Sequence, residues 1–319
     1  MSFAIPRLVN PDDGACILRA LEVSSSLVTD SLVRRMTNGL RMPGVPEAQQ
    51  DPVLKRYPLR RLRIPAGKAQ LSIVVPDSRA WMRQGAWTAA VLRGKEPPYW
   101  CRVWPAAVAI ARHLACLDAL ADGLPLRGLR VLDLGCGVGV PGIQAAAIGA
   151  ELCSADFEPD AGRFAQWNAQ VQPGCSHPPT TQHVDWSQGT VTGTFDIVLL
   201  SDVTYHETHH VPIRRQLKHC LAENGCVLHA DPRRDWSTHF LDQLDGSFAR
   251  HTWHRRTTYL EHDDEVRLTL FANTAEHLHQ WRERLAAPSD LAAGPAVGSA
   301  DPDLAANRPA VNCEGPVTT

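Results

Sequence analysis

Features that would place this chain in a membrane or on a nucleic acid are missing from its sequence. No apolar run in the 319 residues approaches the ~20 residues that span a bilayer. The first residues include Pro6, Asp12 and Asp13, where a signal peptide would need an apolar stretch. Basic and acidic residues number 32 and 34, a balance that gives no global attraction to nucleic acid or to anionic lipid. We therefore expect neither a membrane nor a nucleic-acid partner.

Paired cysteines are also lacking. The nine cysteines are odd in number, scattered, and never spaced as Cys-x-x-Cys. This pattern argues against a disulfide framework and against a cysteine zinc site, so the cytoplasm is the expected location. Hydrophobic residues make up 44% of the chain, which is ordinary for a folded protein and excludes a wholly disordered one.

The two ends of the chain differ in composition from its middle. Residues 286–319 are rich in Ala, Pro and Gly and lack aromatic residues, which predicts a disordered tail. Residues 1–97 predict an N-terminal α+β extension, for which a lid over the substrate is a candidate role. Its expected parts are a helix at 15–36, a proline-rich linker at 43–52, a basic, solvated stretch at 55–63, a strand at 71–75 and a helix at 78–94.

Residues 98–273 alternate apolar strands with helices, a pattern typical of a parallel sheet covered by helices. The last two strands have no helix between them, so they form an antiparallel hairpin, expected to turn at 262–265. The predicted fold class is α/β, a doubly wound, mostly parallel, seven-stranded Rossmann-like sheet with that hairpin at one edge. A C-terminal helix follows at 274–285. The strands are expected at 127–135, 151–157, 180–186, 195–202 and 226–232, and the helices at 104–123, 141–150, 159–171, 210–225 and 235–246.

A glycine-rich loop follows the first strand of this core. The segment 131–139 reads VLDLGCGVG, and in doubly wound sheets ligands bind where such strands end. The second strand ends at Asp156, about 20 residues further on, where an acid suits the two ribose hydroxyls of an adenosine. The loop therefore predicts a site for an adenosine-containing cofactor.

Two cofactor classes match this loop. Residues 137–142 fit the Gly-x-Gly-x-x-Gly fingerprint of dinucleotide sites. However, Pro141 removes one of the backbone N–H donors that a pyrophosphate needs, and Asp133 would repel a pyrophosphate. Because Asp133 instead suits a cationic amino group, S-adenosylmethionine is favoured over NAD.

Residues 98–273 resemble a class I, seven-β-strand methyltransferase, and more narrowly the seven-strand protein-lysine methyltransferase group that includes the lysine methyltransferases of the electron-transfer flavoprotein β subunit. A Gly-Asp-Pro-x-Arg stretch of that branch is similar to residues 231–233 here, with Ala230 in place of the glycine. The position after the fourth strand reads DVTY, unlike the Pro-Pro motif of DNA and glutamine amino-methylases. The main matching motifs are Trp104-Pro105, the loop DLGCGVG, Asp185-Trp186, and Ser201-Asp202 followed by Tyr205.

The resemblance implies S-adenosylmethionine as cofactor and assigns two groups of site residues. Asp202 and Tyr205 are the candidates at the methyl acceptor, where a carboxylate and an aromatic ring would orient an amine. The candidates for cofactor binding are Trp104, Asp133, Gly135, Cys136, Gly137, Asp156, Phe157, Asp185, Trp186 and Ser201.

A zinc-protease signature is also present, since residues 206–210 read HETHH and match His-Glu-x-x-His. That chemistry needs both histidines on one helix face. Here the string begins in a loop, and Pro212 suits a helix that is only starting. We expect a polar loop over the acceptor site and no metal.

The leading functional prediction is an S-adenosylmethionine-dependent methyltransferase that N-methylates a lysine side chain of a protein. One alternative is methylation of a small molecule or natural product at N, O or C. The other is a methyltransferase-like domain that binds partners without catalysis. The sequence leaves the acceptor, the number of methyl groups and the oligomeric state open.

Overall fold

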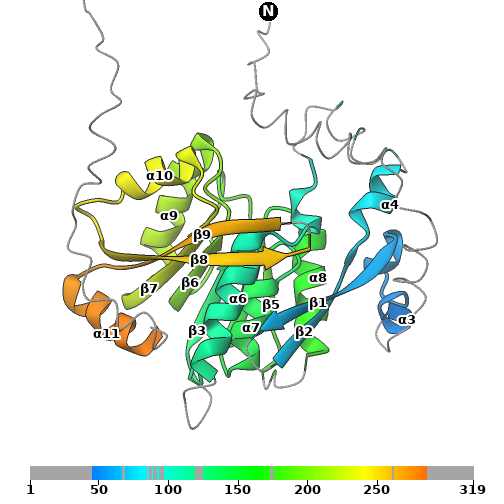
Figure 1. The fold of residues 1–319 in the computed structure, drawn as a ribbon, viewed down its shortest axis with the longest axis horizontal. Coiled ribbons are helices and arrows are strands. Elements are labelled where there is room, and N and C mark those ends of the chain that lie inside the picture. The colour runs from blue at the N-terminus through cyan, green and yellow to red at the C-terminus, as the bar shows by residue number, and fades with distance from the viewer. Residues whose placement is uncertain are drawn as a thin grey trace, which may run out of the picture. The chain divides into compact units, whose positions relative to one another are not determined.

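The fold of the chain is given by a computed structural model (Figure 1). It describes residues 45–285 apart from 67–68, 84, 86–87, 89–91, 93–96, 119–124, 173–174, 176 and 261. The helix predicted for residues 15–36 and the tail predicted for 286–319 lie outside the described residues. In the described part of the chain, no helix is both long enough and apolar enough to cross a bilayer.

Seven strands form one sheet in the order β5-β4-β3-β6-β7-β9-β8. The strands from β5 to β7 in this order are parallel, and β9 runs antiparallel to both β7 and β8. The doubly wound, mostly parallel sheet with an antiparallel terminal hairpin is thereby confirmed. The strands are β3 (Arg130–Leu134), β4 (Glu151–Asp156), β5 (Thr180–His183), β6 (Phe195–Ser201), β7 (Leu221–Asp231), β8 (Ala249–Tyr259) and β9 (His262–Ala272).

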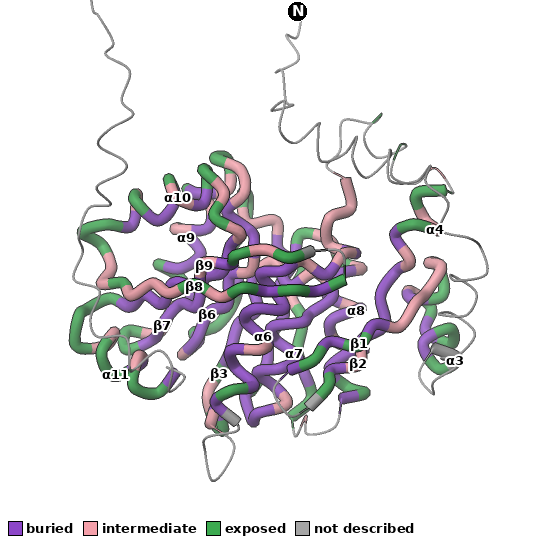
Figure 2. The backbone as a smooth tube through the Cα atoms, viewed as in Figure 1, coloured by how far each residue is buried: buried purple, intermediate pink, exposed green. Residues whose placement is uncertain are grey.

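Helices cover both faces of the sheet because both faces are apolar. Successive side chains of a strand point to opposite faces, so Val131 and Ile197 pack with α6, α7 and α11, whereas Leu132 and Val198 pack with α9 and α10. The buried interior runs along the strands in Figure 2. Burial on both sides explains the continuous apolar strands. The helices are α6 (Pro105–Asp118), α7 (Val140–Ala147), α8 (Pro159–Gln170), α9 (His210–Cys220), α10 (Asp235–Asp242) and α11 (Ala275–Leu285).

The direction of winding reverses at β3. This strand pairs in parallel with β4 on one side and with β6 on the other, so the connections after β3 and after β6 leave in opposite directions. A crevice for ligands forms at such a switch point, outside the carboxyl ends of the strands. The loops after β3, β4, β5 and β6 are therefore the ones that define the site.

Several predicted boundaries are wrong, and two of them have a clear physical reason. The helix expected to reach residue 225 ends at Cys220, and β7 begins at Leu221, which pairs with Phe195 beyond a register shift in β6. The turn expected at 262–265 belongs to β9 instead. There Asp263 pairs across the ladder with Thr258 and receives hydrogen bonds from Arg256 and from the Thr258 hydroxyl. Cross-strand pairs of opposite charge stabilise a ladder, so they extend the strands to the end of the hairpin.

The described part of the N-terminal extension is an α+β unit, as predicted. The expected strand at 71–75 lies within β2, but the basic stretch forms the partner strand β1, and the expected linker contains the short helix α3. These strands pair from Leu59 opposite Pro76 to Ala66 opposite Ala69. The elements are α3 (Val45–Ala48), η2 (Leu54–Arg56), β1 (Leu59–Ala66), β2 (Ala69–Pro76) and α4 (Ser78–Arg83).

Asn168 on α8 attaches this hairpin to the core. Its amide oxygen accepts the N–H of Val74 at 2.8 Å, and its NH₂ donates to the carbonyls of Val74 at 2.9 Å and Val138 at 3.1 Å. Asn168 is fully buried, so these bonds satisfy polar groups that would otherwise be costly to bury. Arg56 also pairs with Asp160 of α8 at 2.5 Å. The extension thus packs on the helices of the core, and its role as a lid stays a prediction.

Candidate active site

The glycine loop after β3 lies against three other segments. Gly135 has φ +74°, and a Cβ on it would lie 2.5 Å from Cγ1 of Val203 and 3.2 Å from Cη2 of Trp186. Gly137 has φ +52°, and its Cβ would lie 3.0 Å from the carbonyl oxygen of Trp100. Only glycine suits such positive φ angles and close approaches. The loops after β5 and β6 and the segment before α6 therefore meet at this one loop.

Asp133, at the end of β3, is fully buried behind the glycine loop. Its Oδ2 accepts the N–H of Gly142, in the first turn of α7, at 3.0 Å, while its Oδ1 has no hydrogen-bond partner among the described residues. Burial raises the pKa of the Asp133 carboxyl to about 8, and the neighbouring charge of Asp156 adds to this increase. A buried carboxylate with an unsatisfied oxygen is costly, and a nearby cation would relieve that cost.

Asp156 closes the other side of the loop. Its Oδ2 accepts the N–H of Gly137 and its Oδ1 the N–H of Glu158, both at 2.9 Å. Burial raises the pKa of Asp156 to about 6. The next residue, Phe157, keeps 53% of its surface exposed, unusual for a large apolar ring beside a buried acid. A carboxylate beside an exposed aromatic ring fits a ribose diol and the face of a base.

Cys136, Asp185 and Ser201, three other predicted cofactor residues, differ in burial and in hydrogen bonding. The Cys136 thiol is buried, and burial raises its pKa well above its ordinary value, so this residue offers its backbone rather than a reactive sulfur. Asp185 follows β5 rather than ending it, and its carboxylate accepts hydrogen bonds from Ser187 and from Gln188 at 2.8 Å. The buried hydroxyl oxygen of Ser201 has no partner among the described residues.

The two candidate acceptor residues lie on the segment after β6. Asp202 is 8% exposed and has φ +52°, an uncommon conformation for a residue other than glycine. Its two carboxylate oxygens accept from Nε and Nη2 of Arg234 at 2.9 and 3.0 Å. This ion pair was not predicted. The sequence does point to Arg234 as a site residue, because the arginine of the similar Gly-Asp-Pro-x-Arg stretch falls on position 234.

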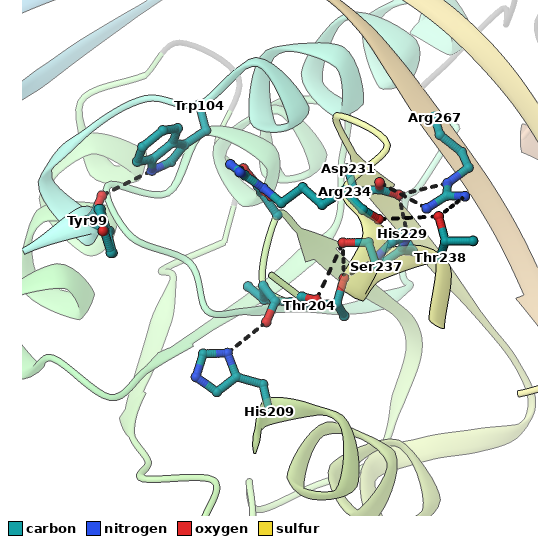
Figure 3. A network of polar contacts seen from close by, with 12 residues as sticks. Tyr99, Trp104, Thr204, His209, His229, Asp231, Arg234, Ser237, Thr238 and Arg267 are labelled. Atoms are coloured by element: carbon teal, nitrogen blue, oxygen red, sulfur yellow. Dashed lines mark hydrogen bonds and ion pairs between the residues drawn. The ribbon is translucent and has the colours of Figure 1, made fainter. Parts of the chain in front are cut away.

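Tyr205 belongs to a row of aromatic rings. Its ring contacts those of Tyr99, with centroids 6.0 Å apart, and His209, 4.9 Å apart. Trp104 continues the row, since its indole N–H donates to the Tyr99 carbonyl at 3.1 Å (Figure 3). On the other side, the ring of His209 contacts Trp186. The row therefore brings together Trp104, Tyr205 and Trp186, three residues predicted from separate motifs, and adds Tyr99 and His209.

The His-Glu-x-x-His string does not form a helical metal motif. Residues Glu207–His209 form the short 3₁₀ helix η4, and α9 starts only at His210. His206 caps η4, because its Nδ1 accepts the N–H of Thr208. This ring nitrogen is therefore engaged in a hydrogen bond within the turn. Within the residues that the structure describes, no three His, Cys, Asp or Glu side chains are grouped to hold a metal ion.

These contacts form a candidate cofactor site at the switch point. The site has two buried carboxylates with raised pKa values, and Oδ1 of Asp133 has no partner among the described residues. With the glycines that admit no Cβ, these features fit a ligand that carries positive charge and an adenosine. The fold and the site together are those of an α/β methyltransferase.

Comparisons with known proteins identify the family. The lysine methyltransferase family model matches residues 97–247. The electron transfer flavoprotein beta subunit lysine methyltransferase of Rattus norvegicus is 30% identical over 186 residues, 57% of this chain and 68% of that protein. METTL21A of Mus musculus, a protein N-lysine methyltransferase, is 30% identical over 153 residues, 46% of this chain and 67% of that protein. A magnesium protoporphyrin IX methyltransferase of Synechocystis, solved with bound S-adenosylmethionine, has a TM-score of 0.40, 22% identity, and coverage of 53% and 80%.

The chain belongs to the lysine methyltransferase family. It is therefore an enzyme that uses S-adenosylmethionine, and the NAD and non-catalytic alternatives are set aside.

Cofactor affinity is expected to rise with pH. Burial raises the pKa values of Asp156 and Asp133 to about 6 and 8. A ligand that places its cationic amino group at Asp133 and its ribose hydroxyls at Asp156 would bind the ionised forms. Between pH 5.5 and 7.5 more of each carboxyl is ionised as the pH rises, so the affinity should increase over this window, by up to ~10-fold per unit for each group that must lose a proton. Calorimetric titration with S-adenosylhomocysteine measures this dependence.

Asp156→Asn removes one of the two titrating groups and should flatten the slope. An affinity independent of pH between 5.5 and 7.5 would show that neither carboxyl must ionise for the ligand to bind.

Proposed function

We propose that this chain transfers methyl groups to the side-chain amine of a lysine in a protein. One observation carries the proposal: the segment of Asp202 and Tyr205 contacts the glycine loop directly, through Val203 against Gly135. An acid and an aromatic ring thus lie beside the cofactor loop, in a family named for lysine methylation. Both relatives described above are named for lysine methylation in proteins.

The reaction requires an amine with a free lone pair. A lysine amine has an ordinary pKa of ~10.4, so it must lose its proton before or during attack. When bound, the cofactor supplies a methyl group on a cationic sulfur, open to in-line displacement. The role of Asp202 is to hold the ammonium by its remaining lone pairs and to take up or pass on the released proton.

Arg234 leaves room for this role. An ionised carboxylate has about four lone-pair sites, and a bidentate guanidinium uses two of them. The Asp202 oxygens can therefore accept an N–H from an incoming amine while Arg234 stays in place. Because the guanidinium fixes the carboxylate plane, the acceptor amine would meet a pre-oriented acid rather than a mobile one.

The aromatic row would line the path of the acceptor. The rings of Tyr99 and Tyr205 present faces and edges to a lysine side chain, which packs its methylene groups on apolar surface. An aromatic face also stabilises the cationic methylated product, so successive methyl groups would be accommodated at the same position.

The proposal extends to location. Seven described cysteines are free thiols, and five of them are buried. Free buried thiols suit a reducing compartment, so we propose that the enzyme meets its protein acceptor in the cytoplasm.

Transfer of radiolabelled methyl groups tests the proposal. The full chain is incubated with labelled S-adenosylmethionine and a cytosolic extract of its organism, and proteins are separated from small molecules. Label is expected on a protein, on lysine after acid hydrolysis, and absent when Asp202→Asn replaces the wild type. Label found only in the small-molecule fraction would instead support the alternative of a small-molecule acceptor.

A further inference from the structure

The segment from Asp202 to Tyr205 rests on a buried polar network that the reaction itself does not use (Figure 3). Oγ1 of Thr204 lies 2.9 Å from Nε2 of His229 on β7 and 2.8 Å from Oγ of Ser237 on α10. All three side chains have no exposed surface. One hydroxyl group therefore joins the acceptor segment to a strand and a helix.

The backbone of the segment is fixed at every residue from 202 to 204. The N–H of Asp202 donates to the Ala230 carbonyl at 2.8 Å. The carbonyl of Val203 is 3.2 Å from Nδ1 of His209, and the carbonyl of Thr204 is 3.4 Å from Nε2 of His210. With Arg234 on the Asp202 carboxylate, the segment has partners in β7, α9, α10 and the loop before α10.

The network is polar but has no contact with solvent. Burial lowers the pKa of His229 to about 4, so this imidazole is neutral at physiological pH. Its Nδ1 faces Asp231 at 3.6 Å, and that carboxylate is held by Nε and Nη2 of Arg267, both at 3.0 Å. A hydroxyl, an imidazole and a carboxylate in this order have the composition of a nucleophilic triad. Since no substrate can reach a fully buried hydroxyl, the group cannot act by attack.

We propose that Thr204, His229 and Ser237 are positioning residues that set the place of Asp202 and Tyr205 relative to the glycine loop. The inference rests on the proposed role of those two residues at the acceptor amine. Asp202 keeps its left-handed backbone because its surroundings hold it, since such a conformation is unfavourable for a residue other than glycine. Val203, one residue before Thr204, touches the Gly135 position, so a shift at Thr204 would change the distance between acceptor and cofactor. A displacement of about 1 Å costs ~100-fold in rate.

The test compares two valine variants. Thr204→Val keeps the shape of the side chain but removes its hydroxyl. Thr257→Val is the matched control: Thr257 is a buried threonine of the outermost strand β8, 1% exposed, whose hydroxyl donates to the Arg255 carbonyl. We expect kcat of Thr204→Val to fall ~10–100-fold, with the Kd for S-adenosylhomocysteine within ~3-fold of wild type. Thr204→Ser should restore kcat to within ~3-fold, because it returns the hydroxyl.

Hydrogen exchange of residues 202–206 provides a readout that needs no substrate. It should speed up in Thr204→Val and stay at the wild-type rate in Thr257→Val. If Thr204→Val does not fold, Ser237→Ala removes one bond of the same hydroxyl and takes its place. Equal kcat in the two valine variants, unchanged exchange, or no recovery in Thr204→Ser would overturn the inference. If the wild type methylated no protein, the proposed function would fail, and the exchange comparison would still decide the anchoring.

Discussion

Asp133→Ala is expected to abolish measurable binding of S-adenosylmethionine. The carboxylate is buried behind the glycine loop, and its Oδ1 has no hydrogen-bond partner in the described part of the chain. A cation placed there would gain a strong, poorly screened interaction. Removing one partner of a buried charged pair costs about 2–5 kcal/mol or more, so the affinity should fall by at least ~30-fold and by up to ~1000-fold or more. Isothermal titration calorimetry on the full chain measures the loss.

Two further variants separate the charge from the fold. Asp133→Asn keeps the volume and can still accept the Gly142 N–H, so it removes mainly the charge and should lose most of the affinity too. Asp196→Ala is the control, because Asp196 also accepts a backbone N–H, from Arg130 at 2.8 Å, but at the opposite end of the strands. Unchanged affinity in a folded Asp133→Ala protein would remove Asp133 from the cofactor site.

Asp202→Asn should lower kcat by about 100–1000-fold, which is within the range for a positioned acid–base group. The amide cannot hold an ammonium as a counter-ion or accept its proton. Cofactor affinity should stay within ~3-fold of wild type, because Asp202 is assigned to the acceptor. The fold should persist, since the Arg234 side chain is 36% exposed and can turn to water. Steady-state transfer to the labelled protein, with calorimetry alongside, separates the two effects.

The matched control is Asp263→Asn. Asp263 also receives two guanidinium nitrogens, from Arg256, but on the terminal hairpin of β8 and β9 rather than on the segment after β6. Its loss should leave kcat unchanged. If Asp202→Asn retained the wild-type kcat, the acceptor amine would have to be oriented by other groups, and Tyr205→Phe would be the next variant to measure.

The strands of the core were predictable because their signal is local. The run 197–200 is apolar on both faces, and 131–134 is interrupted only by Asp133. The glycine loop consists of consecutive residues, so the fold class and the place of the site follow from the sequence. Boundaries were less predictable where pairing with distant residues decides them. Leu221 belongs to a strand because it pairs with Phe195. The residues 210–225 by themselves do not indicate that the helix ends before this position.

The contacts of the site were harder to predict for the same reason. Asp202 could be predicted as an acid after the fourth strand, but its pairing with Arg234 spans 32 residues. His229 follows the apolar residues 226–228 of β7, where a histidine is predicted to be part of the core, and its contacts with Thr204 and Asp231 distinguish it. Motifs identify which residues gather at a strand end. The partners and the direction of each side chain depend on elements that are distant in the sequence.

One hydrophobic cluster of the core extends beyond the segment that the family model matches. The family match begins at residue 97, yet Leu54, Ile64 and Ile73 from the preceding segment share one buried cluster with Ile143 and Phe164 of the methyltransferase helices. The segment that the family model matches is therefore shorter than the one that completes this core. Any element that replaced the N-terminal hairpin would have to cover the same apolar surfaces of α7 and α8.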